Sequence, residues 1–293
     1  MSLVSAAAVR KSFGSRAVLD GLDFAVGARA RIGIVGANGA GKSTLLRLLA
    51  GLEEPDAGTV ARRRDVGVSF LPQHPLGDER AALETVRAAR PDLDELDRDL
   101  HRVAEQLASP ELHDDLDRMA RVLRRQEELV ERWETAGGPS IEGRARATLL
   151  ELGLPEDDLA LPTSALSGGQ RKLVALAACL AQDPDVLLLD EPEAHLDSVG
   201  RALIERLIGR FDGAVVAVSH DRYLLDETVS EIAELDRGRI RTWPGNYSAY
   251  TLARELELQR QQQLYVTQQK EIERLEKAIR RFKDWAHRVV DER

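Results

Sequence analysis

The sequence predicts an α/β fold built around a parallel sheet, and three features support this prediction. First, residues 31–35 read as a short strand that runs through a glycine-rich turn into a helix over residues 44–50. Second, residues 186–189 and 214–218 are continuous apolar runs, as expected for strands that are buried on both faces. Third, a helical stretch separates these two runs, and such alternation is typical of βαβ units.

The composition is that of a folded chain. Of the 293 residues 43% are hydrophobic and 31% charged, which suffices for one large unit with an appendage. The formal net charge of -9 gives no long-range attraction for nucleic acid, so RNA binding would need a local basic patch. The single cysteine, Cys179, lies in an apolar run and should be a small buried hydrophobe. No apolar run approaches the about 20 residues that span a bilayer, which predicts a cytoplasmic protein without membrane insertion.

The chain begins with a strand-rich region, in which residues 18–24 have the strongest β pattern. The helix over residues 44–50 should end at Gly51, because glycine readily adopts the left-handed conformation that closes a helix.

Between residues 91 and 133 charged residues dominate, and apolar ones recur at alternating spacings of three and four. Ser109-Pro110 interrupts the pattern, so we predict two helices that fold back as an antiparallel hairpin. A helical subdomain packed on the core is the alternative, but so narrow a seam favours two helices that pair with each other. The apolar positions are Leu93, Leu96, Leu100, Val103 and Leu107 before the break and Leu112, Leu116, Met119 and Leu123 after it.

The last segment, residues 248–293, contains neither glycine nor proline and carries a heptad stripe over residues 272–289. This predicts one long helix. The pattern reaches Arg293 without a stop signal, and a single amphipathic helix leaves its apolar face unpaired, so we expect a truncated chain.

Residues 36–43 read Gly-Ala-Asn-Gly-Ala-Gly-Lys-Ser, which fits the phosphate-loop pattern between a strand and a helix. Glycines let backbone N–H groups turn towards phosphate oxygens, and the helix N-terminus adds its positive dipole end. Lys42 would reach the terminal phosphates of ATP, and the Ser43 hydroxyl would ligate Mg²⁺. The predicted ATP-binding residues of this segment are Gly36, Asn38, Gly39, Gly41, Lys42, Ser43 and Thr44.

Two acids, Asp190 and Glu191, end the buried strand that starts at residue 186, at an edge expected beside the phosphate loop. Asp190 would hold Mg²⁺ through water, and Glu191 would polarise the water that attacks the γ-phosphate. A solvated acid pair is the alternative, which the phosphate loop in the same chain makes less favourable.

Residues 166–170, Leu-Ser-Gly-Gly-Gln, resemble the signature of the ABC ATPases, and the chain is identified as a member of that superfamily. The resemblance implies a parallel core sheet, an N-terminal antiparallel β subdomain and a helical subdomain. It also implies that this signature closes over ATP held by a second ABC ATPase domain in a head-to-tail pair. The signature residues concerned are Ser167, Gly168, Gly169 and Gln170.

Other positions resemble the family pattern one at a time. Gln73 resembles the glutamine that senses Mg²⁺ and the attacking water, so it joins the expected metal ligands. His220 resembles the switch histidine that touches the γ-phosphate. Phe13 resembles the aromatic residue that stacks on adenine, and Asp197 resembles the acid that communicates between sites. The expected catalytic residues are therefore Glu191, His220 and Gln73.

Three features resemble the ABC-F subfamily, soluble translation factors whose two ATPase domains are joined by a long helical linker. The charged hairpin resembles their arm insertion, residues 219–226 resemble their switch region, and residues 244–250 resemble the start of their linker. The resemblance implies an ABC ATPase domain over residues 1–245 with the arm at residues 91–133, then a linker helix over residues 246–293, with the second half missing.

By this resemblance the partner is the ribosome, through rRNA and tRNA, and the role is in translation or antibiotic resistance. Residues 270–288 hold seven basic residues against four acids, which favours RNA contact, although a solvated helix with internal ion pairs explains the pattern as well. An ATPase subunit of an ABC membrane transporter is the main alternative, but it has no need of a linker helix. A DNA-maintenance ATPase would need a far longer coiled coil.

The sequence departs from the ABC-F pattern at Glu193-Ala194, where the subfamily usually has Thr-Asn. A carboxylate there would slow hydrolysis modestly through like-charge repulsion with Glu191, unless Glu193 points to solvent.

Overall fold

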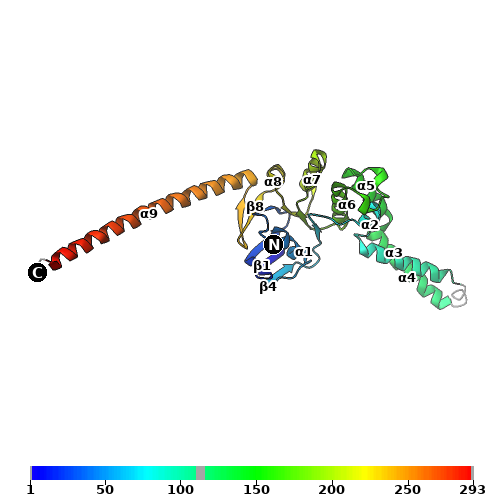
Figure 1. The fold of residues 1–293 in the computed structure, drawn as a ribbon. Coiled ribbons are helices and arrows are strands. Elements are labelled where there is room, and N and C mark those ends of the chain that lie inside the picture. Colours follow the sequence, from blue (N-terminus) through cyan, green and yellow to red (C-terminus); the bar gives the residue numbers. More distant parts are fainter. Residues whose placement is uncertain (1, 110–115, 292–293) are drawn as a thin grey trace.

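The computed structural model describes residues 2–109 and 116–291 (Figure 1). Within these ranges the strands are β1 (Ser2–Phe13), β2 (Arg16–Gly27), β3 (Arg31–Val35), β4 (Ala57–Arg62), β5 (Val68–Leu71), β6 (Val186–Asp190), β7 (Ala214–Val218), β8 (Glu231–Asp236) and β9 (Arg239–Pro244). The helices are α1 (Lys42–Ala50), α2 (Ala82–Arg87), α3 (Pro91–Leu107), α4 (Leu116–Thr135), α5 (Ile141–Glu151), α6 (Gly168–Ala181), α7 (Ser198–Arg210), α8 (Arg222–Thr228) and α9 (Tyr247–Asp291).

These strands form two sheets. The larger sheet has the order β5-β6-β7-β3-β8-β9, with parallel pairing from β5 through β8 and an antiparallel edge strand, β9. The smaller sheet, β2-β1-β4, is antiparallel. The expected α/β fold, with a parallel core sheet and an N-terminal antiparallel sheet, is thereby confirmed.

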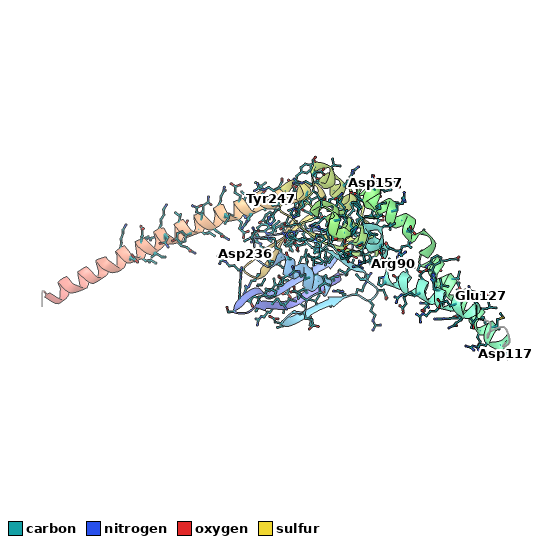
Figure 2. The ribbon with its side chains drawn as sticks, turned by 45° about the vertical axis from the view of Figure 1, so that its right-hand side comes forward. Arg90, Asp117, Glu127, Asp157, Asp236 and Tyr247 are labelled. Atoms are coloured by element: carbon teal, nitrogen blue, oxygen red, sulfur yellow. The ribbon has the colours of Figure 1, made fainter. Side chains whose placement is uncertain are left out.

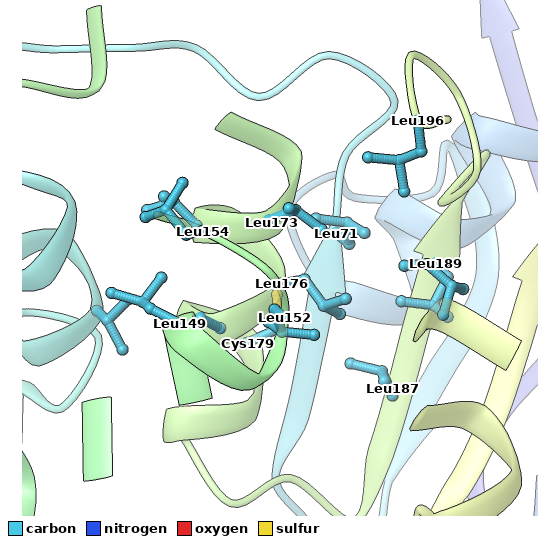
Figure 3. Packing of buried hydrophobic residues seen from close by; sticks show 14 of the residues in the cluster. Leu71, Leu149, Leu152, Leu154, Leu173, Leu176, Cys179, Leu187, Leu189 and Leu196 are labelled. Atoms are coloured by element: carbon cyan, nitrogen blue, oxygen red, sulfur yellow. The ribbon is translucent and has the colours of Figure 1, made fainter. Parts of the chain in front are cut away.

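The interior strand β6 is apolar from Val186 to Leu189 because both of its faces are covered. Val186 and Leu188 pack with leucines of α1 and with the smaller sheet. Leu187 and Leu189 point the other way, into a cluster formed with α5 and α6, which Figure 3 shows together with the buried Cys179. Helix α1 ends, as expected, at Gly51, whose φ of 64° is left-handed. The sheet is therefore held rigidly between two apolar layers.

Helices α3 and α4 pack against each other and extend away from the sheets, as both views show (Figures 1 and 2). The expected seam on α3 is buried there, with Leu93, Leu96 and Val103 at its centre. On α4 the expectation was wrong at Leu123, which is 44% exposed, because the seam passes through Val122 and Leu129 instead. Leu112 and the side chain of Leu116 lie outside the described residues.

Helix α9 leaves the core on the side opposite to the hairpin (Figure 1). Its first turns are anchored, because Tyr250 packs edge-on against Trp243 with ring centroids 5.7 Å apart. Asp226 of α8 accepts hydrogen bonds from the backbone N–H and the hydroxyl of Ser248, each at 2.7 Å. Of its seven expected basic residues, the side chains of Arg280, Arg281, Lys283 and Arg288 lie outside the described residues. Over the described ranges, no helix is both long and apolar enough to cross a bilayer.

Candidate functional site

The parallel sheet brings four segments to one edge. Residues 36–43 follow β3, Gln73 follows β5, Glu191 follows β6 and His220 follows β7. Because these four strands are parallel and adjacent, their carboxyl ends lie at the same edge, which is where ligands bind in such sheets.

Two glycines of the phosphate loop, Gly36 and Gly41, stand where a side chain does not fit. A Cβ at Gly36 would overlap the carbonyl oxygen of Leu235, and one at Gly41 would lie 2.5 Å from a methyl carbon of Val18. Gly41 also has a φ of 107°, and it begins α1 with no side-chain cap in the part of the chain that the structure describes. The first N–H groups of α1 are thus available to an anion such as a phosphate.

Lys42 lies over this loop and is only 7% exposed. Its Nζ donates to the carbonyl oxygens of Gly36 at 2.8 Å and of Ala37 at 3.1 Å. Burial lowers the pKa of Lys42, while the negative charges of Glu191 and Asp190 oppose that shift. A phosphate would give this ammonium group the strong anionic partner that the two carbonyl oxygens do not provide.

Asp190 is almost fully buried at 2% exposure. Burial raises its pKa, and a hydrogen bond with Ser43 opposes the shift. Its Oδ1 atom is buried without a hydrogen-bond partner among the described residues. An unpartnered carboxylate oxygen beside a serine hydroxyl is the type of donor set that Mg²⁺ takes, so these residues fit the expected metal.

Glu191 turns away from the end of β6 with a left-handed φ of 46°, which places a non-glycine residue in a sparsely populated conformation. The Nε2 atom of Gln73 donates to Oε2 of Glu191 at 2.8 Å. On the other side, Nε2 of His220 lies 3.6 Å from Oε1 of Glu191. Gln73 and His220, the two other residues expected to be catalytic, therefore each contact the Glu191 carboxylate.

Lys172 also belongs to this site, although the sequence interpretation did not include it. It is completely buried, and its Nζ donates to the carbonyl oxygens of Gln73 at 2.7 Å and of Asp190 at 3.3 Å. Burial lowers its pKa to about 8, opposed by the charges of Asp190, Glu193 and Glu191. One feature of the sequence could have indicated its burial: Lys172 precedes Leu176 by four residues, which places both on the apolar face of the same helix.

Glu193 does not point to solvent, so that alternative was wrong. It is 9% exposed, and its Oε1 accepts hydrogen bonds from residues 219–221, which we call the switch segment. The reason is local: these three residues follow the end of β7, and β7 is the neighbour of β6.

The signature residues lie at the start of α6. Ser167 caps the helix in a reciprocal capping box with Gln170. Gly169 packs so closely on the His195 carbonyl that a Cβ would lie 2.7 Å from its oxygen. Gln170 also donates to Asp158. Over the described ranges, no hydrogen bond joins the signature to residues 36–44.

Phe13 is half exposed at the end of β1, opposite Arg16 of β2. The guanidinium of Arg16 donates to the carbonyl oxygen of Gly39 at 3.0 Å, so the Phe13 hairpin adjoins the phosphate loop.

Asp197 caps α7 by accepting from the Gly200 N–H at 2.8 Å. The remaining expected residues of the loop differ in burial: Asn38 is exposed and Thr44 is buried within α1.

A family model described as "ABC transporter" matches residues 19–194, and a second with the same description matches residues 233–291. The chain is 37% identical over 246 residues to the energy-dependent translational throttle protein EttA of Escherichia coli, covering 84% of this chain and 43% of that protein. It is 37% identical over 278 residues to the tylosin resistance ATP-binding protein TlrC of Streptomyces fradiae, covering 93% and 50% respectively. The chain thus spans half the length, or less, of these two relatives.

Among solved structures, a dimeric bacterial ABC transporter cassette superposes with a TM-score of 0.59 at 22% identity, covering 82% of this chain and 98% of that one. A cassette determined in a post-hydrolysis state with ADP and Pi superposes with a TM-score of 0.57 at 23% identity, covering 82% and 98%. These two likenesses concern the fold. Since the first family model spans more than half of the 293 residues, the chain belongs to the ABC family.

Proposed function

We propose that this chain is the ATP-binding and ATP-hydrolysing part of an ABC-F protein that acts on the ribosome, in translation or in antibiotic resistance. By their names, the two curated relatives are a translational throttle protein and an antibiotic resistance ATP-binding protein. The hairpin α3–α4 and helix α9 support the proposal, because both extend away from the sheets towards space where a large partner can be contacted.

The contact of Glu191 with both Gln73 and His220, beside the phosphate loop, is the observation that carries the hydrolytic function. In the proposed reaction Lys42 binds the terminal phosphates, and Glu191 orients and deprotonates the water that attacks the γ-phosphate. Gln73 and His220 hold that carboxylate in place. Ser43, Asp190 and Gln73 would hold Mg²⁺, which neutralises negative charge on the phosphate oxygens.

The remaining site residues have proposed roles in nucleotide binding. Phe13 stacks on adenine, and the signature binds ATP of a second ABC domain while Asp197 communicates between the two sites. The hydrogen bonds of Ser167 and Gln170 support this, because they keep the N-terminus of α6 ordered without engaging the loop of the same chain. A composite site of this kind implies that an isolated chain binds ATP but hydrolyses it slowly.

Hydrolysis is tested with Glu191→Gln in a form of the protein that carries two ABC domains. The amide keeps the shape of the side chain but cannot accept the proton, so turnover should fall about 100-fold or more while ATP binding persists. Glu227→Gln, an exposed acid on α8, is the matched control and should behave as the parent. Unimpaired turnover by Glu191→Gln would contradict the role of Glu191 as the base.

The ribosomal role is tested by co-sedimentation of the full-length Glu191→Gln protein with ribosomes, with ATP and without it. Trapping the ATP-bound state should make pelleting ATP-dependent. Addition of Lys42→Ala should abolish that dependence, because the phosphates then lose their ammonium partner. No association under either condition would favour the ATPase subunit of an ABC membrane transporter.

A further inference from the structure

A buried carboxylate lies two residues beyond Glu191, on the turn that leaves β6. Glu193 is 9% exposed, and burying an ionised carboxylate is costly unless it is hydrogen-bonded. This side chain must therefore have a compensating set of contacts.

Its Oε1 atom accepts three hydrogen bonds from the switch segment. The Ser219 hydroxyl donates at 2.5 Å, the His220 backbone N–H at 3.2 Å and the Asp221 backbone N–H at 3.4 Å. The Asp221 N–H also donates to the Ser219 Oγ at 2.9 Å, so the hydroxyl accepts one hydrogen bond and donates another to Glu193. One carboxylate oxygen thus binds every residue of the switch segment.

The position of this segment sets the position of the histidine. His220 is exposed, and its imidazole lies 3.6 Å from Glu191. Asp221, which follows it, caps α8 by accepting from the N–H groups of Tyr223 and Leu224. The histidine is therefore carried on a short loop whose C-terminal end is fixed by a cap and whose N–H groups are fixed by Glu193.

We propose that Glu193 is a positioning residue, which acts through the switch segment to hold His220 against Glu191. This inference rests on the proposed ATP hydrolysis. Glu193 does not touch the reacting atoms; it joins the turn after β6, which carries Glu191, to the turn after β7, which carries His220. The backbone pairing of the two strands reaches as far as Glu191, whose N–H donates to the Val218 carbonyl oxygen at 2.8 Å, and beyond that point the Glu193 side chain joins the two turns.

The Glu193 carboxylate also interacts with a group of opposite charge, which offers a competing explanation for its role. Glu193 is among the acids whose charge acts on the buried Lys172 ammonium. Its Oε2 atom is buried without a hydrogen-bond partner among the described residues, so only Oε1 carries the contacts to the switch segment. If the main role of Glu193 were its charge, Glu193→Gln would lower kcat as Glu193→Ala does. If its main role were to accept hydrogen bonds, Glu193→Gln would keep kcat, because an amide oxygen can accept from the same three donors.

The experiment compares Glu193→Ala with Glu193→Gln in the form of the protein with two ABC domains. We expect Glu193→Ala to lower kcat about tenfold, with KM for ATP within about twofold of the parent, because the phosphate loop is unchanged. Glu193→Gln should retain kcat within about threefold. In a His220→Ala background, Glu193→Ala should lower kcat by at most about a further twofold, since the effects of substituting residues that act as a unit do not add.

Two results would overturn the inference while leaving the proposed hydrolysis intact. One is parental kcat in Glu193→Ala; the other is an equal loss in the parent and His220→Ala backgrounds, which would indicate a structural role independent of His220. Failure of the parent to hydrolyse ATP would instead refute the proposed function.

A second measurement needs no turnover. Amide hydrogen exchange at His220 should be about tenfold faster in Glu193→Ala than in the parent, and near parental in Glu193→Gln, because only the alanine removes the acceptor of this N–H. Unchanged exchange in Glu193→Ala would refute the inference even if hydrolysis were absent.

Discussion

The buried ammonium group of Lys172 makes a quantitative prediction about stability and pH. Lys172→Met removes the charge and the donor while keeping a flexible side chain of similar length. In the parent the ammonium is completely buried and donates to two carbonyl oxygens, those of Gln73 and Asp190. Burial nevertheless leaves it costly to protonate in the folded state.

The magnitude follows from the pKa of Lys172, which burial lowers from 10.5 to about 8. A shift of this size corresponds to about 3 kcal/mol between the two protonation states. Below pH 8 both the folded and the unfolded chain carry the proton, and the folded state bears the full penalty. Between pH 8 and 10.5 the folded state releases the proton and the unfolded state keeps it, so stability rises with pH.

Urea unfolding of the parent and of Lys172→Met at pH 7.5 and pH 10.5 measures this effect. The free energy of unfolding of the parent should rise relative to the variant by about 3 kcal/mol over this interval, while titrations common to both proteins cancel. Arg171→Met provides the control, because an arginine keeps its proton throughout the range. Parallel profiles for the parent and Lys172→Met would refute the depressed pKa.

Three further predictions concern single contacts. Gly41→Ala should weaken ATP binding at least about tenfold and destabilise the fold, because its Cβ would lie 2.5 Å from a carbon of β2 at a left-handed φ; isothermal titration and thermal melting measure both. Cys179 should resist iodoacetamide at pH 8 in the folded chain, because burial raises its pKa to about 12 and the thiolate is the reactive form; mass spectrometry follows the alkylation. Asp226→Ala should speed hydrogen exchange at Ser248 about tenfold, because the backbone acceptor at 2.7 Å is lost.

Each of these three predictions has a control or a result that would contradict it. Gly209→Ala, at a helical position with open space, should instead stabilise the chain by about 0.5–1 kcal/mol and leave ATP binding unchanged. Cys179 should become reactive once urea unfolds the chain. Exchange at Ser248 that does not respond to Asp226→Ala would mean that other contacts hold the start of α9.

Much of the site could be predicted because its parts are local in the sequence. The phosphate loop depends on consecutive residues between a strand and a helix, and the acids Asp190 and Glu191 simply follow a buried strand. Their meeting at one edge follows from parallel strand order, a general property of such sheets. The continuous apolar run of β6 likewise predicts that both of its faces are covered, because a strand with one solvated face would alternate apolar and polar residues.

Lys172 and Glu193 could not be placed in the same way. Lys172 reaches the carbonyl of Gln73 across 99 residues, and no local pattern specifies such a contact. The direction of the Glu193 side chain depends on three donors that belong to another strand's turn. On α4 the buried side of the helix was misassigned at Leu123, because the spacing of apolar residues does not by itself decide which of two adjacent positions, Val122 or Leu123, faces the partner helix.

The attachment of α9 at its base has a geometric consequence. With 45 residues at about 1.5 Å per residue, the helix is roughly 68 Å long. Tyr250 on Trp243, Ser248 on Asp226 and the ion pairs Arg254–Glu234 and Glu257–Arg241 anchor it within residues 247–257. Asp226 belongs to the short helix that starts directly after the switch segment. A rotation of about 5° there would sweep the far end through roughly 6 Å. Small movements at the edge of the sheet that holds the phosphate loop would therefore produce displacements of several ångströms at the far end of α9.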